Sequence, residues 1–175
     1  MLLSRPAKTS DVRSIAALGR ATFVETFGAL FADHEMDLAS YLAATFSPAK
    51  IASSMAQSGN RFWIARQDSK PIGYAKLKLE SAHPAVPGQR AAQLQKIYVL
   101  RAHLGTGAGK LLLDAVLECA HDAHCDRLWL TVLETNEQAI GFYQRAGWVK
   151  CAKDTHRIGA QKFVYDVLTA TITVG

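Results

Sequence analysis

The sequence has few cysteines, no long apolar run and no block of like charges, and each absence excludes a class of protein. The three cysteines, Cys119, Cys125 and Cys151, are an odd number without the spacing of a disulfide framework. No apolar run approaches the roughly 20 residues that a transmembrane helix needs. Residues 1–11 lack the apolar centre of a signal peptide. We therefore expect a cytoplasmic protein without a membrane partner.

The charge pattern argues against two further classes. The net charge of +5 comes from 20 basic and 15 acidic residues that are scattered along the chain. Scattered charge is typical of a solvated surface, so we expect no nucleic-acid partner. Cys119, His121, His124 and Cys125 cluster at the end of a helical pattern, but no second ligand pair follows at a zinc-site spacing. We therefore expect no metal.

The length and the apolar periodicity predict one α/β domain over residues 1–175. A chain of 175 residues that is 49% hydrophobic supports one full-sized core. The period-two and period-3.6 patterns place elements along the whole chain. Strands are expected at 3–5, 61–66, 72–80, 93–100, 127–133, 148–153 and 161–168, and helices at 12–23, 36–45, 48–57, 107–123 and 137–146. This order predicts three layers, with helices on both faces of one sheet.

Local signals mark several of the helix ends. Ser10 or Asp11 is expected to cap the first helix, and Ser47 the third, because a side-chain oxygen there accepts a free amide hydrogen. Gly147 suits the position just after a helix end. In the helix at 107–123 the buried face is expected to hold Leu111, Leu112, Ala115, Val116 and Cys119.

Three alternating glycines follow the strand at 93–100 and precede a helix. The segment reads Leu104, Gly105, Thr106, Gly107, Ala108, Gly109 and Lys110. Glycine lets the backbone approach a ligand closely and adopt positive φ, and a helix start offers unpaired N–H groups with a positive dipole end. Together these features predict an anion site that fits a pyrophosphate.

Two common phosphate motifs do not match this segment. A Walker loop needs a glycine where Leu104 stands and Ser or Thr where Leu111 stands. A dinucleotide fingerprint needs G-x-G-x-x-G near the first strand of a βαβ unit, whereas here the spacing is G-x-G-x-G in mid-chain.

Three ordered blocks resemble the GNAT superfamily of acetyltransferases. They are Gln-Lys-Ile-Tyr-Val at 95–99, the glycine segment at 104–110, and Asn136-x-x-Ala-Ile-x-Phe-Tyr143-x-x-x-Gly-Trp148. The stretches at 22–27 and 155–159 resemble the PaiA-like bacterial branch, whose members are described as spermidine/spermine N-acetyltransferases. The resemblance implies a mostly antiparallel mixed sheet that splays open beside the strand at 93–100, acetyl-CoA as co-substrate, and a small amine, such as a polyamine, as acceptor. Homodimers are common in this family, so we expect one.

The resemblance also implies roles for individual residues. Backbone groups of Ile97 and Val99 would pair with the pantetheine arm, and the amides of 104–110 would bind the pyrophosphate. Asn136 would contact the pantetheine region, and Tyr143 would point at the thioester sulfur. Two positions depart from the family: Leu104 replaces a common Arg or Gln, and Gln93 replaces a common Glu. A neutral amide at Gln93 cannot serve as general base.

The chemistry of amine acetylation suggests further candidates. A lysine-like amine with pKa of about 10.4 is neutral in only about one molecule in 2,500 at pH 7, so a base is valuable. Glu134 and Glu25 are the base candidates, and Tyr143 is the acid candidate because a phenol can protonate the leaving thiolate. Tyr98 and His156 are expected as relay or pocket groups on the acceptor side.

Two other functions stay open from the sequence. One is an enzyme of the same fold that acetylates a protein N-terminus, a lysine or an aminoacyl group. The other is a CoA-binding regulatory domain that has lost catalysis, which Gln93 motivates.

Overall fold

The computed structural model describes residues 1–172. The strands are β1 (Leu2–Pro6), β2 (Asn60–Gln67), β3 (Lys70–Lys78), β4 (Ala91–Val99), β5 (Arg127–Leu133), β6 (Val149–Ile158) and β7 (Gln161–Thr171). The α-helices are α1 (Val12–Phe27), α2 (Glu35–Phe46), α3 (Pro48–Met55), α4 (Ala108–Asp122) and α5 (Glu137–Arg145). Three short 3₁₀ helices are η1 (Thr9–Asp11), η2 (Gly28–Phe31) and η3 (Arg101–His103).

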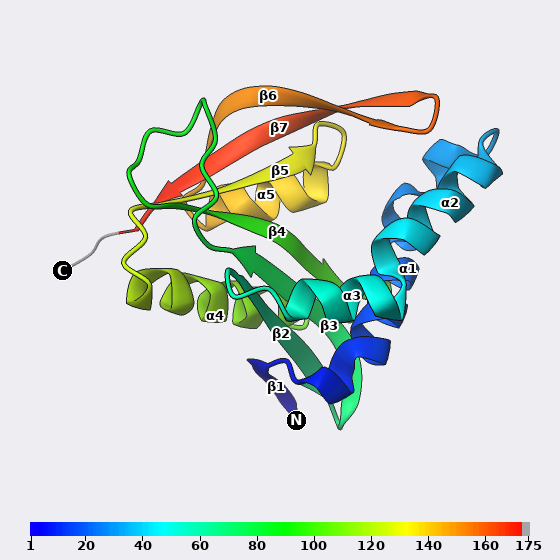
Figure 1. Ribbon diagram of the computed structural model, residues 1–175, viewed down its shortest axis with the longest axis horizontal. Coiled ribbons are helices and arrows are strands. Elements are labelled where there is room, and N and C mark those ends of the chain that lie inside the picture. Colours follow the sequence, from blue (N-terminus) through cyan, green and yellow to red (C-terminus); the bar gives the residue numbers. More distant parts are fainter. Residues whose placement is uncertain (173–175) are drawn as a thin grey trace. The chain divides into compact units, whose positions relative to one another are not determined.

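The strands form one seven-stranded mixed sheet in the order β1-β2-β3-β4-β5-β7-β6 (Figure 1). The pairs β1–β2, β5–β7 and β6–β7 are antiparallel, whereas β4 and β5 are parallel. The parallel register covers only Ala91–Gln93 on β4, opposite Arg127–Trp129 on β5. The mixed, mostly antiparallel α/β fold expected from the sequence is confirmed.

The chain divides into two compact units that share β4 and α4. The first unit contains Met1–Leu77 and Lys96–Val116, and the second contains Lys78–Gln95 and everything from Leu117 onward. Each unit is described by itself below. The expectation of a single domain over 1–175 stays a prediction.

The first unit packs helices against a three-strand core. Residues of α1, α3, β2 and β3 share one buried cluster that includes Ile15, Ile51, Ile64 and Tyr74. Figure 1 shows α1 and α3 together on one face of β2 and β3, with the start of α4 behind these strands. The β2–β3 turn is tight because Asp68 and Ser69 both adopt positive φ.

In the second unit the long β6–β7 hairpin pairs with β5 (Figure 1). Its core includes Trp129 and Val167, and the Trp129 indole N–H donates to the carbonyl of Ser81 at 2.7 Å. Helix α5 ends at Arg145, and Gly147, with a φ of +85°, stands just after its cap as expected. The hairpin is longer than expected, because β6 continues through the polar residues Asp154–Arg157 to Ile158.

Two expectations about helices are wrong. Asp11 does not cap α1 with its side chain; its carboxylate instead pairs with Arg5 at 2.7 Å and Arg66 at 3.1 Å, and accepts the Lys8 amide. Ser10 makes no cap either. The buried face of α4 is shifted, because Leu113 and Ala120 are buried beside Leu112 and Val116, while Leu111, Ala115 and Cys119 are only partly buried.

Candidate active site

The glycine segment forms an open turn at the start of α4. Gly105 and Gly107 have φ of +78° and +91°, a region that side chains other than glycine rarely adopt. A Cβ on Gly105 would meet no atom within 4 Å, and one on Gly107 would meet only Leu2 at 4.0 Å. The backbone at both glycines therefore faces free space that a ligand can enter.

Most amide hydrogens of the glycine segment lack an acceptor among residues 1–172. The Leu104 amide donates to the Arg101 carbonyl at 3.2 Å, so, contrary to expectation, it is not free for a phosphate, and the next amide with a backbone acceptor is that of Leu111, which donates to Gly107 at 3.0 Å. The amides of Gly105–Lys110 have no hydrogen-bond acceptor in the same part of the chain. A helix start with free N–H groups and a positive dipole end binds a phosphate. The residues present thus fit the diphosphate of coenzyme A.

Side chains around this turn are already engaged. The Lys110 ammonium pairs with Asp114 at 2.6 Å, and the Thr106 hydroxyl donates to the carbonyl of His103 at 2.8 Å. His103 Nδ1 lies 2.9 Å from Gln67 Oε1 and can donate to it. Leu104 is exposed. The anion site is therefore made by backbone amides rather than by side-chain cations.

Glu25 holds the segment that precedes the glycine turn. Its carboxylate accepts the backbone N–H of Arg101 at 2.8 Å, and the Arg101 guanidinium donates to the carbonyl of Glu25. Helix α1 is thereby joined to η3, immediately before the glycine segment. Glu25 thus has a structural partner that sequence reasoning missed.

The second half of β4 carries Ile97, Tyr98 and Val99. Gly73 on β3 lets these backbones come close, because a Cβ there would lie 2.6 Å from the carbonyl oxygen of Tyr98. The Tyr98 ring stands edge-on to Tyr74, with ring centroids 5.7 Å apart. Burial raises the pKa of the Tyr98 phenol, so this residue stays protonated near neutral pH.

In the second unit, Asn136 begins α5. Its Oδ1 accepts the amide hydrogen of Ala139 at 3.2 Å, which is a helix N-cap. Glu134, just after β5, pairs with Lys153 of β6 at 2.6 Å, with side-chain exposures of 37% and 53%. The Glu134 hydrogen bond raises the pKa of Lys153. Glu134 is thus a partly exposed carboxylate held at the end of a central strand.

Tyr143 lies on α5 and is only 6% exposed. Its ring centroid lies 5.1 Å from that of Phe142 and 5.6 Å from that of Trp148. Phe142 is less buried than Tyr143. His156 is exposed on β6, with its ring centroid 5.3 Å from that of Tyr165.

The predicted residues therefore fall into two groups. The turn at 104–110, Glu25, Ile97, Tyr98 and Val99 lie in the first unit. Glu134, Asn136, Tyr143 and His156 lie in the second unit. Gln93 is also in the second unit, where its Oε1 accepts the Gln95 amide at 3.0 Å.

Sequence reasoning also missed Lys96. This lysine lies on β4 among aromatic rings, over Phe46 and Tyr98. The available signal was a cation between Leu94 and Tyr98 on one face of the strand.

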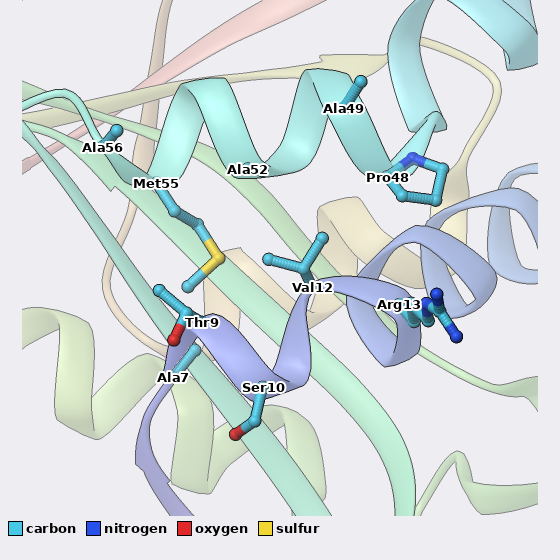
Figure 2. A pocket seen from close by; sticks show the side chains of 10 residues that line it. All are labelled: Ala7, Thr9, Ser10, Val12, Arg13, Pro48, Ala49, Ala52, Met55 and Ala56. Atoms are coloured by element: carbon cyan, nitrogen blue, oxygen red, sulfur yellow. The ribbon is translucent and has the colours of Figure 1, made fainter.

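A groove elsewhere in the first unit contains none of these residues. It has a volume of about 700 Å³ and lies between the start of α1 and α3. Figure 2 shows its lining, with small side chains such as Ala52 along α3 and the Met55 sulfur pointing toward Thr9. The lining brings no acid and base together, so it offers no chemistry for acyl transfer.

The described residues contain no group of three or more His, Cys, Asp or Glu side chains that could hold a metal ion. The same part of the chain, residues 1–172, also has no helix that is both long and apolar enough to cross a membrane.

The sequence model of the Acetyltransferase (GNAT) family matches residues 23–148. The chain belongs to this family. An uncharacterized N-acetyltransferase of Mycobacterium bovis is 31% identical over 153 residues, which cover 86% of this chain and 91% of the relative. The GNAT chain is therefore an acyltransferase that uses acetyl-CoA.

Solved structures share the GNAT fold. The PaiA N-acetyltransferase of Thermoplasma acidophilum, in complex with coenzyme A, has a TM-score of 0.75 and 17% identity, and the match covers 98% of this chain and 99% of that one. The ribosomal-protein-S18-alanine N-acetyltransferase of Escherichia coli has a TM-score of 0.69 and 17% identity, covering 100% and 96%. At these identities the likeness concerns the fold.

Proposed function

We propose that this GNAT enzyme transfers the acetyl group of acetyl-CoA to the primary amine of a small acceptor by direct attack on the thioester. The observation that carries the proposal is the open turn at Gly105–Lys110, whose amides have no protein acceptor among the described residues. Amides fixed in this way bind a diphosphate without rearrangement, so they position the far end of the cofactor.

The strand before this turn supplies the next contacts. Backbone groups of Ile97 and Val99 are proposed to hold the pantetheine arm, and the Val99 N–H to stabilise the oxyanion that forms on the attacked carbonyl. A fixed donor of this kind, when removed, typically lowers turnover by about a hundredfold or more. Gly73 supports this arrangement because it lets β3 lie close behind Tyr98 and Val99.

Proton transfer is assigned to two residues of the second unit. Tyr143 is proposed to protonate the leaving thiolate, a step that helps because a thiol has a pKa of about 8.5. Glu134 is proposed to accept the amine proton, directly or through water. Deprotonating a lysine-like amine at pH 7 costs about 4.6 kcal/mol if nothing offsets it. Both base candidates have a partner, since Glu134 pairs with Lys153 and Glu25 accepts the Arg101 amide; Glu134 is preferred because it lies in the same unit as Tyr143.

An acceptor panel tests the proposed function. Purified enzyme is incubated with acetyl-CoA and with spermidine, monoamines, amino acids or short peptides, and thiol release is followed together with the mass of the product. We expect acetylation of at least one small primary amine. Acetylation of peptides alone would instead support a protein N-acetyltransferase. Tight acetyl-CoA binding without any transfer would contradict the enzyme mechanism and favour a regulatory domain.

The homodimer and the cytoplasmic location remain predictions. Light scattering during size-exclusion chromatography measures the first directly, because one chain has a mass of 19.0 kDa.

A further inference from the structure

Lys96 places a cation among aromatic side chains of the first unit. Its Nζ lies 5.5 Å from the centroid of the Phe46 ring and 5.3 Å from that of Tyr98. Its nearest polar atom given by the structure is the Tyr98 hydroxyl, at 3.4 Å. Lys96 and Tyr98 are two residues apart on β4, so their side chains share the face of the strand that meets α2.

This cation has no counter-ion within residues 1–172. None of the ion pairs in that part of the chain includes Lys96. Two acidic groups of the first unit have partners of their own: Asp11 binds Arg5 and Arg66, and Glu25 accepts the Arg101 amide. Lys96 is partly buried among aromatic rings and has no paired carboxylate in the described part of the chain, whereas charges withdrawn from water are normally paired.

The aromatic rings offset only part of the free-energy cost of burying the Lys96 charge. Burial lowers the pKa of the Lys96 amine, and the nearby Tyr41 phenol opposes that change. A cation over aromatic faces is stabilised, but less than by a hydrogen-bonded carboxylate. The environment thus lacks an anion, and a bound anion would stabilise the charged form of Lys96.

The position remains open to a ligand. Phe46 is only 1% exposed. Lys96, Tyr98 and Tyr41, in contrast, each keep part of their surface accessible to solvent. Lys96 is also the residue immediately before Ile97, at the stretch of β4 proposed to hold the thioester end of the cofactor. An anionic group bound at Lys96 would therefore lie next to the strand segment that is proposed to hold the acetyl group.

We propose that Lys96 binds a carboxylate of the acceptor, so that the acceptor is an amine of the amino-acid class rather than a polyamine. This inference rests on the proposed function, because it names the substrate class of the same site. A polyamine has no anion to offer, and a second cation beside Lys96 would be repelled. Tyr98 contributes its hydroxyl as a second donor to the same carboxylate.

Matched pairs of acceptors test this inference. Each pair differs by one carboxylate: arginine and agmatine, lysine and cadaverine, tyrosine and tyramine, with spermidine as an additional polycation. We expect kcat/KM to be at least about tenfold higher for the carboxylated member of the best pair, as for a charge-assisted hydrogen bond. Calorimetry of the same amines in the presence of coenzyme A gives the same ranking without requiring turnover.

Two variants assign the preference to Lys96. Lys96→Met keeps the volume and removes the charge, so the ratio within each pair should fall to about one while acetyl-CoA affinity is unchanged. Lys96→Arg keeps a permanent cation, so it should retain a preference for the carboxylated amine. Circular dichroism confirms that both variants are folded.

Several outcomes would overturn the inference. Equal kcat/KM within every pair would show that Lys96 does not bind a carboxylate of the acceptor. A preference that persists in Lys96→Met would show the same. Equal losses of kcat on all acceptors in both variants would instead make Lys96 a proton acceptor. If the wild-type enzyme acetylates no amine, the proposed function fails, and calorimetry then decides the inference: binding without discrimination, or no binding, contradicts it.

Discussion

Helices α4 and α5 both follow a strand, but they begin in opposite ways. At α5 the Asn136 side chain accepts the Ala139 amide, so the helix start is satisfied from within. At α4 the amides of Gly105–Lys110 have no acceptor in the described part of the chain, and the glycines keep the approach free of side chains. A helix start left open in this way is suited to an external anion, whereas a capped one serves stability.

The start of α1 extends the comparison, because its acidic residue is used for neither purpose. Asp11 is 2% exposed and pairs with two arginines, so Asp11→Asn should lower the free energy of unfolding by about 3 kcal/mol at pH 7. Denaturant unfolding of the variant and the wild type measures this difference.

The pH dependence of this effect has a defined sign. The Arg5 guanidinium holds the pKa of Asp11 well below its usual range, so the stabilisation is complete above the unfolded pKa of about 3.9. It is lost as the pH falls through the lower folded pKa. The stability difference between wild type and Asp11→Asn should therefore be constant from pH 5 to 7 and shrink below about pH 4; a constant difference down to pH 2 would rule out the ion pair as its cause.

A substitution at Gly107 tests directly whether the open start of α4 binds the cofactor. Gly107→Val places a branched side chain in the space over the amides and disfavours the φ of +91°, so acetyl-CoA affinity should fall about a hundredfold. Calorimetry with acetyl-CoA measures the change.

Gly147→Val is the matched control for backbone strain. Gly147 has a φ of +85° and, like Gly105, has no atom within 4 Å of an added Cβ, but it stands just after the end of α5. We expect this variant to lose stability and to keep its acetyl-CoA affinity. An equal loss of affinity in both variants would mean that strain, rather than blocking of the amides, weakens binding.

Tyr143 extends the comparison of α4 and α5, because it is proposed to act in catalysis from within α5 rather than from the start of that helix. Tyr143→Phe should lower kcat roughly thirtyfold, less than a typical general acid, because a thiolate leaves without full protonation. Acetyl-CoA affinity should change less than twofold. A kcat at the wild-type level over the whole pH range would remove Tyr143 as the acid.

The smallest expected effect concerns the capped start of α5. Asn136→Ala removes the acceptor for the Ala139 amide, so the free energy of unfolding should fall by about 1 kcal/mol. Asn136→Asp keeps an oxygen at that position and should keep the stability. If Asn136→Asp nevertheless weakens acetyl-CoA binding, the side-chain amide has the cofactor contact that the family resemblance implies.

Features that depend on neighbours in the sequence were predictable. Ser47 accepts the Lys50 amide at 3.2 Å and caps α3 as expected, and Gly147 stands just after the end of α5. The glycine turn and the helix after it were also located within one residue. In each case the local residue type determines the local backbone conformation.

Features that depend on distant partners were not predictable. Asp11 looks like a cap, but Arg66, 55 residues away, takes its carboxylate. Glu25 was a candidate base, but it accepts the amide of Arg101, 76 residues away. The end of β6 shows no apolar alternation, and its strand conformation comes from pairing with β7, as at His156 and Phe163. Tertiary contacts decide these positions, and no local pattern encodes them.

The most direct test of the open helix start is a titration of ¹⁵N-labelled protein with coenzyme A, followed by amide NMR. The account predicts that the largest chemical-shift changes fall on the amides of Gly105–Lys110, as these N–H groups gain phosphate acceptors, while the capped Ala139 amide keeps its partner. Saturable binding that leaves the Gly105–Lys110 amides unchanged would contradict the central claim.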